Sequence, residues 1–327
     1  MQNPTSSETF FSPRRLGHAN LWAENIDVSA QFYRDICGLT LEFSEPDLKA
    51  HFLGTGHTPH DLGMMETTKG VNRYGRNGLL QLPGTIGLKP GLNHLAWELE
   101  NEAELVQAFR RLKAAGIHTD MTVDHQVAHS VYIFDPDRNY NEFYCDTVKD
   151  WRSVLQGEME LLTSAWDPLQ AEGFTEGRYD TDPELRVVAS APIHPRRVTH
   201  AVLVTPQLEA MRQFYTRVGG LREIERTDSV VYLAPGLQSY SHALVLVAGA
   251  AAAYHHVSFE LQNDEALDHA LEDLQARGMQ PVRVVDLPWK RSFFLKDPDG
   301  LQSEWYVPRQ GVRDLHTIAD TPMPFAV

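Results

Sequence analysis

Short stretches of alternating apolar and polar residues run through most of the chain, and four longer segments place apolar residues every three to four positions. Alternation is typical of half-buried β-strands, and the longer period is typical of amphipathic helices. The longer period predicts helices at residues 28–37, 102–115, 208–218 and 265–277. Asp27 is the predicted N-cap of the first helix, and a glycine follows each end, at Gly38, Gly116, Gly219 and Gly278. Because each helix follows one strand and precedes several others, the pattern predicts four β-α-β-β-β modules in an α+β fold.

The four modules form two related pairs. The segment RRLGHANLWAENIDVSAQFYRDICGL, from Arg14, matches RRVTHAVLVTPQLEAMRQFYTRVGGL, from Arg196, at an offset of 182 residues. Further along, LNHLAWEL and YHHVSFEL match at an offset of 162 residues. We interpret the chain as an internal duplication. The fall in the offset from 182 to 162 means that the first copy carries 20 additional residues, which lie between Met65 and His94.

The insertion and the connecting segments divide the chain. We expect an N-terminal domain at residues 1–147, a linker region at 148–195, a C-terminal domain at 196–308 and a tail at 309–327, with a short helix within 151–162. The insertion holds six glycines between Gly70 and Gly91, among scattered apolar side chains. Such a loop is suited to act as a lid over a site. A surface excursion, or contact with the other domain or a partner subunit, is the alternative.

Charge and cysteine content narrow the class of protein. The 29 Lys and Arg residues are outnumbered by 44 Asp and Glu, a net charge of −15, which argues against nucleic acid or an anionic membrane as partner. The longest apolar run, at residues 243–254, is much shorter than the roughly 20 residues that span a bilayer. Two cysteines, Cys37 and Cys145, indicate reduced thiols and a cytoplasmic protein, and we expect Cys145 to be buried and inert. We also expect a homo-oligomer.

Ligand-type side chains recur at matching places in the two copies. His18, His94 and Glu142 lie on predicted strands of the first copy, and the second copy repeats them as His200, His256 and Glu304. Two imidazoles and one carboxylate form the triad that binds Fe(II) with open coordination positions, although catalytic zinc uses the same ligands. A single strand histidine is more often a packing residue. The repetition favours a metal site, while inherited residues can also persist after a duplication without a function.

The segment DHQVAHSVYIFDPDRNYNEFYCD, together with the histidines in LNHLAWEL and YHHVSFEL, resembles the vicinal oxygen chelate superfamily. Within it, the chain is similar to the type I extradiol dioxygenases of the catechol 2,3-dioxygenase type, over residues 14–147 and 196–308. The resemblance implies paired β-α-β-β-β modules that form a cupped mixed sheet around a metal site. It also implies Fe(II), with Mn(II) as an alternative, and a catechol and O2 as substrates.

The resemblance assigns roles to individual residues of the first copy. His125 matches the acid–base histidine of the family, Tyr132 the active-site tyrosine and His60 a further pocket histidine. His129, four residues nearer to Tyr132 along the chain, is an alternative to His125. A histidine suits proton transfer because its pKa lies near neutrality.

The second copy lacks part of this set. Leu287 and Phe294 stand where the first copy has His125 and Tyr132, although His242 and the triad remain. We therefore expect a catalytic N-terminal copy and a vestigial or structural C-terminal site. Many two-domain relatives in this family have the reverse arrangement. The first copy also has Arg138 where the family usually has glycine, which would alter the turn or point into the pocket mouth.

The function predicted from these features is extradiol ring cleavage, the addition of both atoms of O2 to a catechol that carries a sizeable or apolar substituent. The alternatives are a metal-dependent isomerase or lyase of the glyoxalase-like type, and a non-enzymatic protein that binds small aromatic molecules. We expect two aromatic pairs at helical spacing, Phe32–Tyr33 and Phe214–Tyr215, to be packing residues. Three histidines are expected on the surface or in loops, namely His51, His57 and His118.

Overall fold

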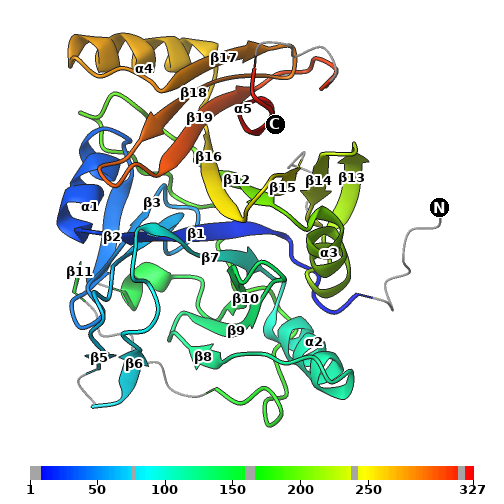
Figure 1. Cartoon of the computed structure of the whole chain (residues 1–327). Helices are drawn as coiled ribbons and strands as arrows, with labels where there is room; N and C mark the ends of the chain where they lie inside the picture. The colour runs from blue at the N-terminus through cyan, green and yellow to red at the C-terminus, as the bar shows by residue number, and fades with distance from the viewer. Residues whose placement is uncertain (1–8, 76–77, 156, 159–165, 237–241, 316–320) are drawn as a thin grey trace.

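The computed structural model describes residues 9–75, 78–155, 157–158, 166–236, 242–315 and 321–327. Two curled mixed sheets form its body, one from each half of the chain (Figure 1). The first sheet has the order β11-β2-β3-β4-β1-β7-β10-β9-β8, and the second has the order β13-β14-β15-β12-β16-β19-β18-β17. Apart from the added β11, the second order repeats the first strand for strand. The predicted α+β fold of paired β-α-β-β-β modules is confirmed.

In each module one strand precedes the helix and further strands follow it. The first half contains β1 (Arg15–Ala23), β2 (Thr40–Glu45), β3 (Ala50–Gly54), β4 (Leu62–Glu66), β5 (Arg73–Tyr74), β6 (Leu80–Leu82), β7 (Gly91–Glu98), β8 (Thr122–Asp124), β9 (Ala128–Phe134), β10 (Tyr140–Asp146) and β11 (Gly157–Glu158). The second half contains β12 (Arg197–Thr205), β13 (Arg222–Arg226), β14 (Val230–Ala234), β15 (Leu244–Ala248), β16 (Ala253–Glu260), β17 (Arg283–Leu287), β18 (Lys290–Lys296) and β19 (Gln302–Pro308).

The helices begin and end close to the predicted positions. They are α1 (Ile26–Asp35), α2 (Glu102–Ala114), α3 (Leu208–Gln213) with the π-helical turn η2 (Phe214–Val218), and α4 (Asp264–Ala276). The N-cap of α1 is Asn25, not Asp27 as predicted, because the side-chain oxygen of Asn25 accepts hydrogen bonds from the backbone amides of Asp27 and Val28. Gly219 follows the end of η2 as expected, and the next residue, Gly220, has the left-handed φ of 70°. None of the helices in the described ranges is long and apolar enough to cross a bilayer.

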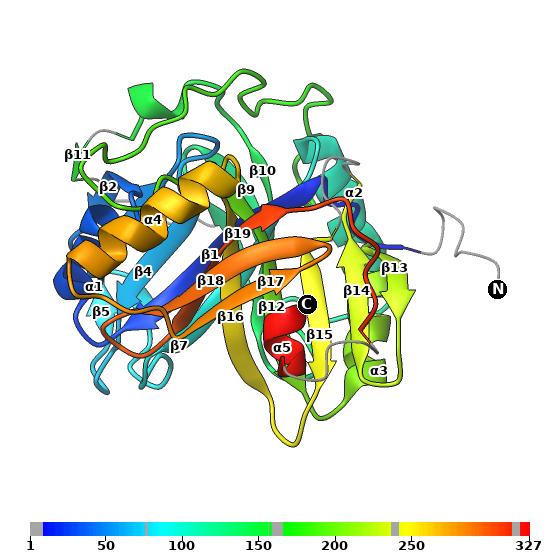
Figure 2. The same cartoon turned by 90° about the horizontal axis from the view of Figure 1, so that it is seen from above.

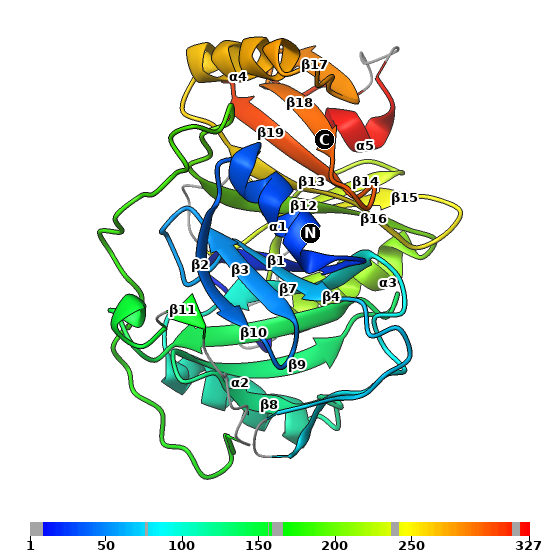
Figure 3. The ribbon, with the colours of Figure 1, turned by 90° about the vertical axis from the view of Figure 1, so that its left-hand side faces the viewer.

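The two halves pack on each other through reciprocal contacts. The hydroxyl of Tyr33, on α1, donates to Asp297 of the second half at 3.3 Å, and the hydroxyl of Tyr215, on η2, donates to Asp135 of the first half at 2.9 Å. Both tyrosines are fully buried in one apolar core that joins the halves, as expected for packing residues. Burial raises the pKa of each aspartate to about 6. Figure 3 shows α1 between its own sheet and the end of β19.

The insertion forms a small hairpin of its own from β5 and β6. Arg73 reaches inward, and its guanidinium donates to the carbonyl oxygens of Leu48 and Thr67, both at 2.6 Å. Several apolar side chains of the described part of the insertion stay exposed, namely Val71, Tyr74, Leu79, Leu80, Ile86 and Leu88. The hairpin therefore braces the turn between β2 and β3 while leaving an apolar outer surface.

The linker region follows the outside of the first half (Figure 2). Of the short helix expected within residues 151–162, the structure has one 3-10 turn, η1 (Trp151–Ser153), and residues 159–162 lie outside the described ranges. Trp151 and Leu155 are buried against Phe43 and Phe52 of the first sheet. This turn therefore completes the apolar wall on the side of β2 and β3.

Candidate metal centre

Three ligand-type side chains converge on the concave face of the first sheet. His18 lies on β1, His94 on β7 and Glu142 on β10, and these strands are neighbours in the order β1-β7-β10. The Nε2 atom of His18 lies 3.3 Å from Nε2 of His94 and 3.2 Å from Oε2 of Glu142, and the third separation, from His94 to Glu142, is 3.1 Å. All three side chains are buried.

This donor set fits a divalent cation. Ligand atoms that each lie about 2.1 Å from one ion are separated by roughly 3 Å when they occupy adjacent positions. Burial lowers the pKa of His18, so this imidazole is neutral and its lone pair is free to bind an ion. Burial alone would raise the pKa of Glu142, but its close contacts with His18 and His94 hold that pKa well below its usual value. The site therefore offers two imidazole lone pairs and one negative charge.

Two further residues orient the ligands, and the sequence analysis missed both. The hydroxyl of Ser130 donates to Oε1 of Glu142 at 2.6 Å, and Nδ1 of His94 lies 2.8 Å from the side-chain oxygen of Asn93. A proton on Nδ1 leaves the Nε2 lone pair of His94 directed at the other two ligands. Ser130 was identifiable in principle, because it lies two residues before Tyr132 and so shares its face of β9.

A cavity opens next to the three ligands, and together with the solvent-filled space at its mouth it measures about 650 Å³. Its walls are mainly apolar and come from Phe43, Leu48, Phe52, Met65, Val127 and Ala128, with the acids Glu45 and Asp146 among its lining residues. None of the described residues of the insertion lines it, so the expected lid is not over the cavity in this structure. The insertion supports the cavity wall from behind, through the contact of Arg73 with Leu48 and through Leu82 of β6, which is buried in the same apolar cluster as Phe43 and Phe52.

The structure brings His60, His125 and Tyr132 to this cavity. The ring of His60 packs on that of His18 with centroids 3.9 Å apart, and both of its buried nitrogens lack a hydrogen-bond partner among the described residues. Nε2 of His125 lies 3.0 Å from the Tyr132 hydroxyl. Burial lowers the pKa of both histidines and raises that of Tyr132. At neutral pH the cavity therefore holds two neutral imidazoles and one protonated phenol.

His129, the alternative to His125, points away from the cavity. Its Nδ1 atom lies 2.7 Å from Glu102 at the start of α2, and its ring stacks on Trp166 of the linker region with centroids 4.6 Å apart. His125 is thus the histidine that the fold directs to the metal ligands, with Nε2 3.8 Å from Glu142.

The other residues singled out in the sequence are not among those that line the cavity. Arg138 keeps the tight turn in a left-handed conformation with φ 68°, and its guanidinium lies over the ring of Phe134 at 4.0 Å, outside the residues that line the cavity. His118 is exposed and His57 lies half-buried in a loop, both as expected, whereas His51 lies on strand β3 and pairs with Asp27. Both cysteines are free and buried, which raises the pKa of their thiols.

The second triad gathers on the corresponding face of the second sheet. His200 lies on β12, His256 on β16 and Glu304 on β19, and the side chains are fully buried. Each imidazole Nε2 lies 3.5 Å from Oε2 of Glu304. Phe294 packs edge-on against His256, at the place where Tyr132 packs against His94. Both triads are thus assembled, and His242 packs on His200 as His60 packs on His18, but the second triad lacks the counterparts of His125 and Tyr132.

Comparison with protein families supports this description. The model described as the Glyoxalase/Bleomycin resistance protein/Dioxygenase superfamily matches residues 15–143 and 197–304. The chain therefore belongs to this superfamily, and the resemblance drawn from its motifs is confirmed.

Particular relatives narrow the class further. The chain is 26% identical over 171 residues to biphenyl-2,3-diol 1,2-dioxygenase 3 of Rhodococcus globerulus. This alignment covers 50% of this chain and 83% of that protein. It is 26% identical over 236 residues to the catechol-2,3-dioxygenase of Bacillus subtilis (strain 168), covering 71% and 73%. The 2,3-dioxygenase LapB from Pseudomonas sp. KL28 superposes with a TM-score of 0.65 at 15% identity, covering 93% of this chain and 96% of that one, a similarity of fold.

Proposed function

We propose that this chain is an extradiol ring-cleavage dioxygenase, which adds both atoms of O2 to a substituted catechol, with Fe(II) held by His18, His94 and Glu142. One observation carries the proposal: in the first half, an open His/His/Glu cluster and the His125–Tyr132 pair line the same cavity. The related proteins named above are ring-cleaving dioxygenases. Bound there, Fe(II) would supply Lewis acidity and open coordination positions that bring a catechol and dioxygen together. Mn(II) suits the same ligands.

The proton-handling residues follow from their surroundings. The pKa of His125 is lowered by burial, so at neutral pH its imidazole is a base that can accept a proton from a catechol hydroxyl and return it later. The Tyr132 hydroxyl, kept protonated by burial and the nearby Glu142 charge, donates a hydrogen bond to His125 or to a substrate oxygen. His60 presents nitrogens without a partner among the described residues, and we assign it to hydrogen bonding of the substrate.

The cavity wall indicates the substituent on the ring. Phe43, Phe52 and Val127 offer apolar surface to an alkyl or aryl group. No lysine or arginine is among the described residues that line the cavity, and Glu45 and Asp146 offer no positive charge, so an anionic group such as a carboxylate would lose its hydration there without gaining a counter-charge. We therefore expect uncharged, apolar-substituted catechols to be the preferred substrates.

Reconstitution tests this function. The full chain is loaded anaerobically with Fe(II), and separately with Mn(II), and is then mixed with air-saturated buffer and a panel of alkyl-, aryl- and carboxyl-substituted catechols. We expect oxygen uptake matched by a yellow ring-opened product, fastest with the uncharged substrates. Stoichiometric metal binding without oxygen uptake from any catechol would contradict ring cleavage. Isomerisation of a 2-oxoaldehyde–thiol adduct by the same sample would instead favour the glyoxalase-like class.

A further inference from the structure

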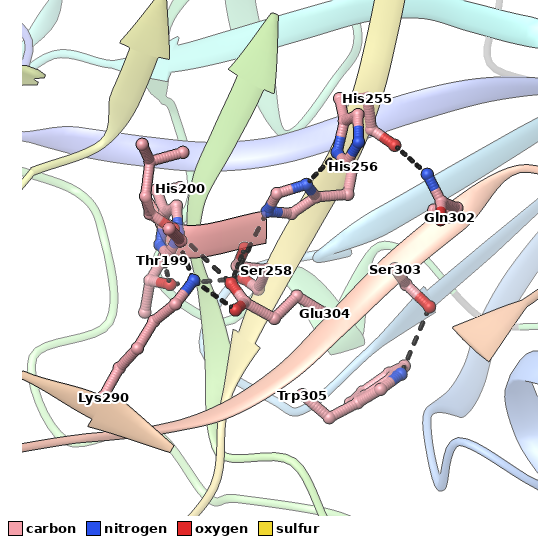
Figure 4. Close-up of polar contacts among 12 residues, drawn as sticks. Thr199, His200, His255, His256, Ser258, Lys290, Gln302, Ser303, Glu304 and Trp305 are labelled. Atoms are coloured by element: carbon pink, nitrogen blue, oxygen red, sulfur yellow. Dashed lines mark hydrogen bonds and ion pairs between the residues drawn. The ribbon is translucent and has the colours of Figure 1, made fainter. Parts of the chain in front are cut away.

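The second triad contains a positively charged side chain of the protein itself. Nζ of Lys290, on β18, donates to Oε1 of Glu304 at 2.6 Å, and the lysine is 4% exposed (Figure 4). The hydroxyl of Ser258 donates to the other carboxylate oxygen, Oε2, at 2.7 Å. Both oxygens of the carboxylate therefore already have donors, and the nearest charge to it is an ammonium group.

A second segment covers this ammonium. We call residues 321–327, which include α5 (Met323–Ala326), the plug segment. Lys290 donates to the main-chain oxygen of Val327, and the indole of Trp289 donates to the main-chain oxygen of Ala326 at 3.0 Å.

Apolar contacts hold the plug segment in the curve of the second sheet. Val327 and Met323 pack with Val202 of β12 and Val245 of β15, and the ring of Phe325 lies 4.9 Å from that of Phe294. The space that corresponds to the cavity of the first half is therefore filled by the chain itself.

The first half shows what the lysine replaces. At the offset of 162 residues, Lys290 corresponds to Ala128, and the strand register agrees, because Lys290 pairs with Leu287 while Ala128 accepts a backbone hydrogen bond from His125. The short side chain of Ala128 lines the open cavity. One position thus carries a methyl group beside an open triad and an ammonium inside a closed one.

We infer that Lys290 takes the place of a metal ion in the second triad, and that with the plug segment it restricts metal binding to the first. An ammonium supplies the positive charge that Glu304 requires in a buried site, and it blocks the approach of a cation by repulsion and by volume. The second triad is then a masked metal site, which removal of one side chain can open. This inference rests on metal binding by His18, His94 and Glu142 but not on ring cleavage.

Metal stoichiometry tests the inference on the full chain. After dialysis against Mn(II) and metal analysis, we expect one ion per chain, none in His94→Ala and one in His256→Ala. Substitutions at the corresponding positions 128 and 290 should change which triad binds the ion. In His94→Ala/Lys290→Ala, a single ion should bind at the second triad, seen also as a rise in melting temperature on addition of Mn(II). In Ala128→Lys, the first ion should be lost.

The outcomes separate the two proposals. Two ions in the unsubstituted chain, or loss of an ion in His256→Ala alone, would overturn the role of Lys290. No ion in the unsubstituted chain would remove the proposed function, while a gain in His94→Ala/Lys290→Ala would still support the masked site. If that variant does not fold, His94→Ala/Lys290→Met keeps the packing of the lysine stem without its charge, and metal-dependent stabilisation of it above that of His94→Ala supports the inference. No stabilisation of a folded variant overturns it.

Discussion

The two halves of this chain share a strand order and a His/His/Glu cluster, but a cavity lies beside the first cluster, whereas the plug segment packs beside the second. The difference comes from few positions. Lys290, Phe294 and Leu287 stand where the first half has Ala128, Tyr132 and His125. The ligands of a metal site are therefore retained in a duplicated half that has lost the residues for proton transfer. In that half, a lysine neutralises the carboxylate and the chain itself fills the adjacent space. A ligand triad alone does not identify a catalytic site.

The largest effect is expected from removing a ligand in one half and its counterpart in the other. His94→Ala and Glu142→Ala should lose the metal ion and reduce ring cleavage to background, because two ligands do not hold the ion in a reactive position. His256→Ala should keep both the metal ion and the turnover. Metal analysis and oxygen uptake measured on the same samples check this, and the opposite pattern would move the catalytic site to the second half.

Proton transfer gives the next largest effect. His125→Phe and Tyr132→Phe should bind metal normally and lower kcat by about 10²–10⁴-fold, the range for a positioned acid or base. His129→Phe is the matched control, since its ring lies against Trp166 outside the cavity, and its kcat should stay within a few-fold of the unsubstituted chain. A large loss in His129→Phe with none in His125→Phe would reassign the acid–base role.

The reciprocal aspartates of the interface between the halves predict a pH dependence of stability. The pKa of both Asp135 and Asp297 is raised to about 6 by burial, so between about pH 4 and pH 6 the folded chain binds more protons than the unfolded chain. The free energy of unfolding should therefore fall as pH rises through this window, by up to about 3 kcal/mol per carboxyl.

Asp135→Asn and Asp297→Asn should each remove an equal share of this slope in denaturant titrations at several pH values. The exposed control Asp273→Asn should leave the slope unchanged. Unequal effects of the two variants would show that Asp135 and Asp297 contribute differently to stability, although each accepts a hydrogen bond from a tyrosine of the other half.

The smallest effect concerns the two turns that carry Arg138 and Gly300. Both residues have a left-handed φ, which costs an L-residue about 1–2 kcal/mol, but Arg138 recovers part of it by packing on Phe134. In the second half, Lys296 stands at the position of Phe134 and would repel an arginine. Arg138→Gly should thus change stability by less than about 1 kcal/mol, and Gly300→Arg should cost about 1–2 kcal/mol. Thermal unfolding of both variants checks this. If Arg138→Gly stabilises the chain by as much as Gly300→Arg destabilises it, the ring of Phe134 has no role in stabilising Arg138.

Much of the fold could be predicted because it depends on local pattern and on the repeat. Alternation and helical period located the modules, and the two offsets aligned the halves, which in turn identified both triads and the positions of Leu287 and Phe294. The predicted N-cap of α1 was wrong by two residues, because asparagine and aspartate are similarly favoured at this position. Only the backbone conformation decides whether Asn25 or Asp27 precedes the helix.

The sequence by itself determined the fold class, the duplication, the ligand triads and the likeness to ring-cleaving dioxygenases, since these are carried by residue type and spacing. Tertiary structure alone decided the direction of side chains and the use of space. It directed His125 into the cavity and His129 out of it, and it brought Lys290 to Glu304. It also packed the plug segment against Val202 of β12 and Val245 of β15, two strands far from it in the sequence. Contacts between distant segments depend on how strands curl and pack, and spacing along the chain does not record them.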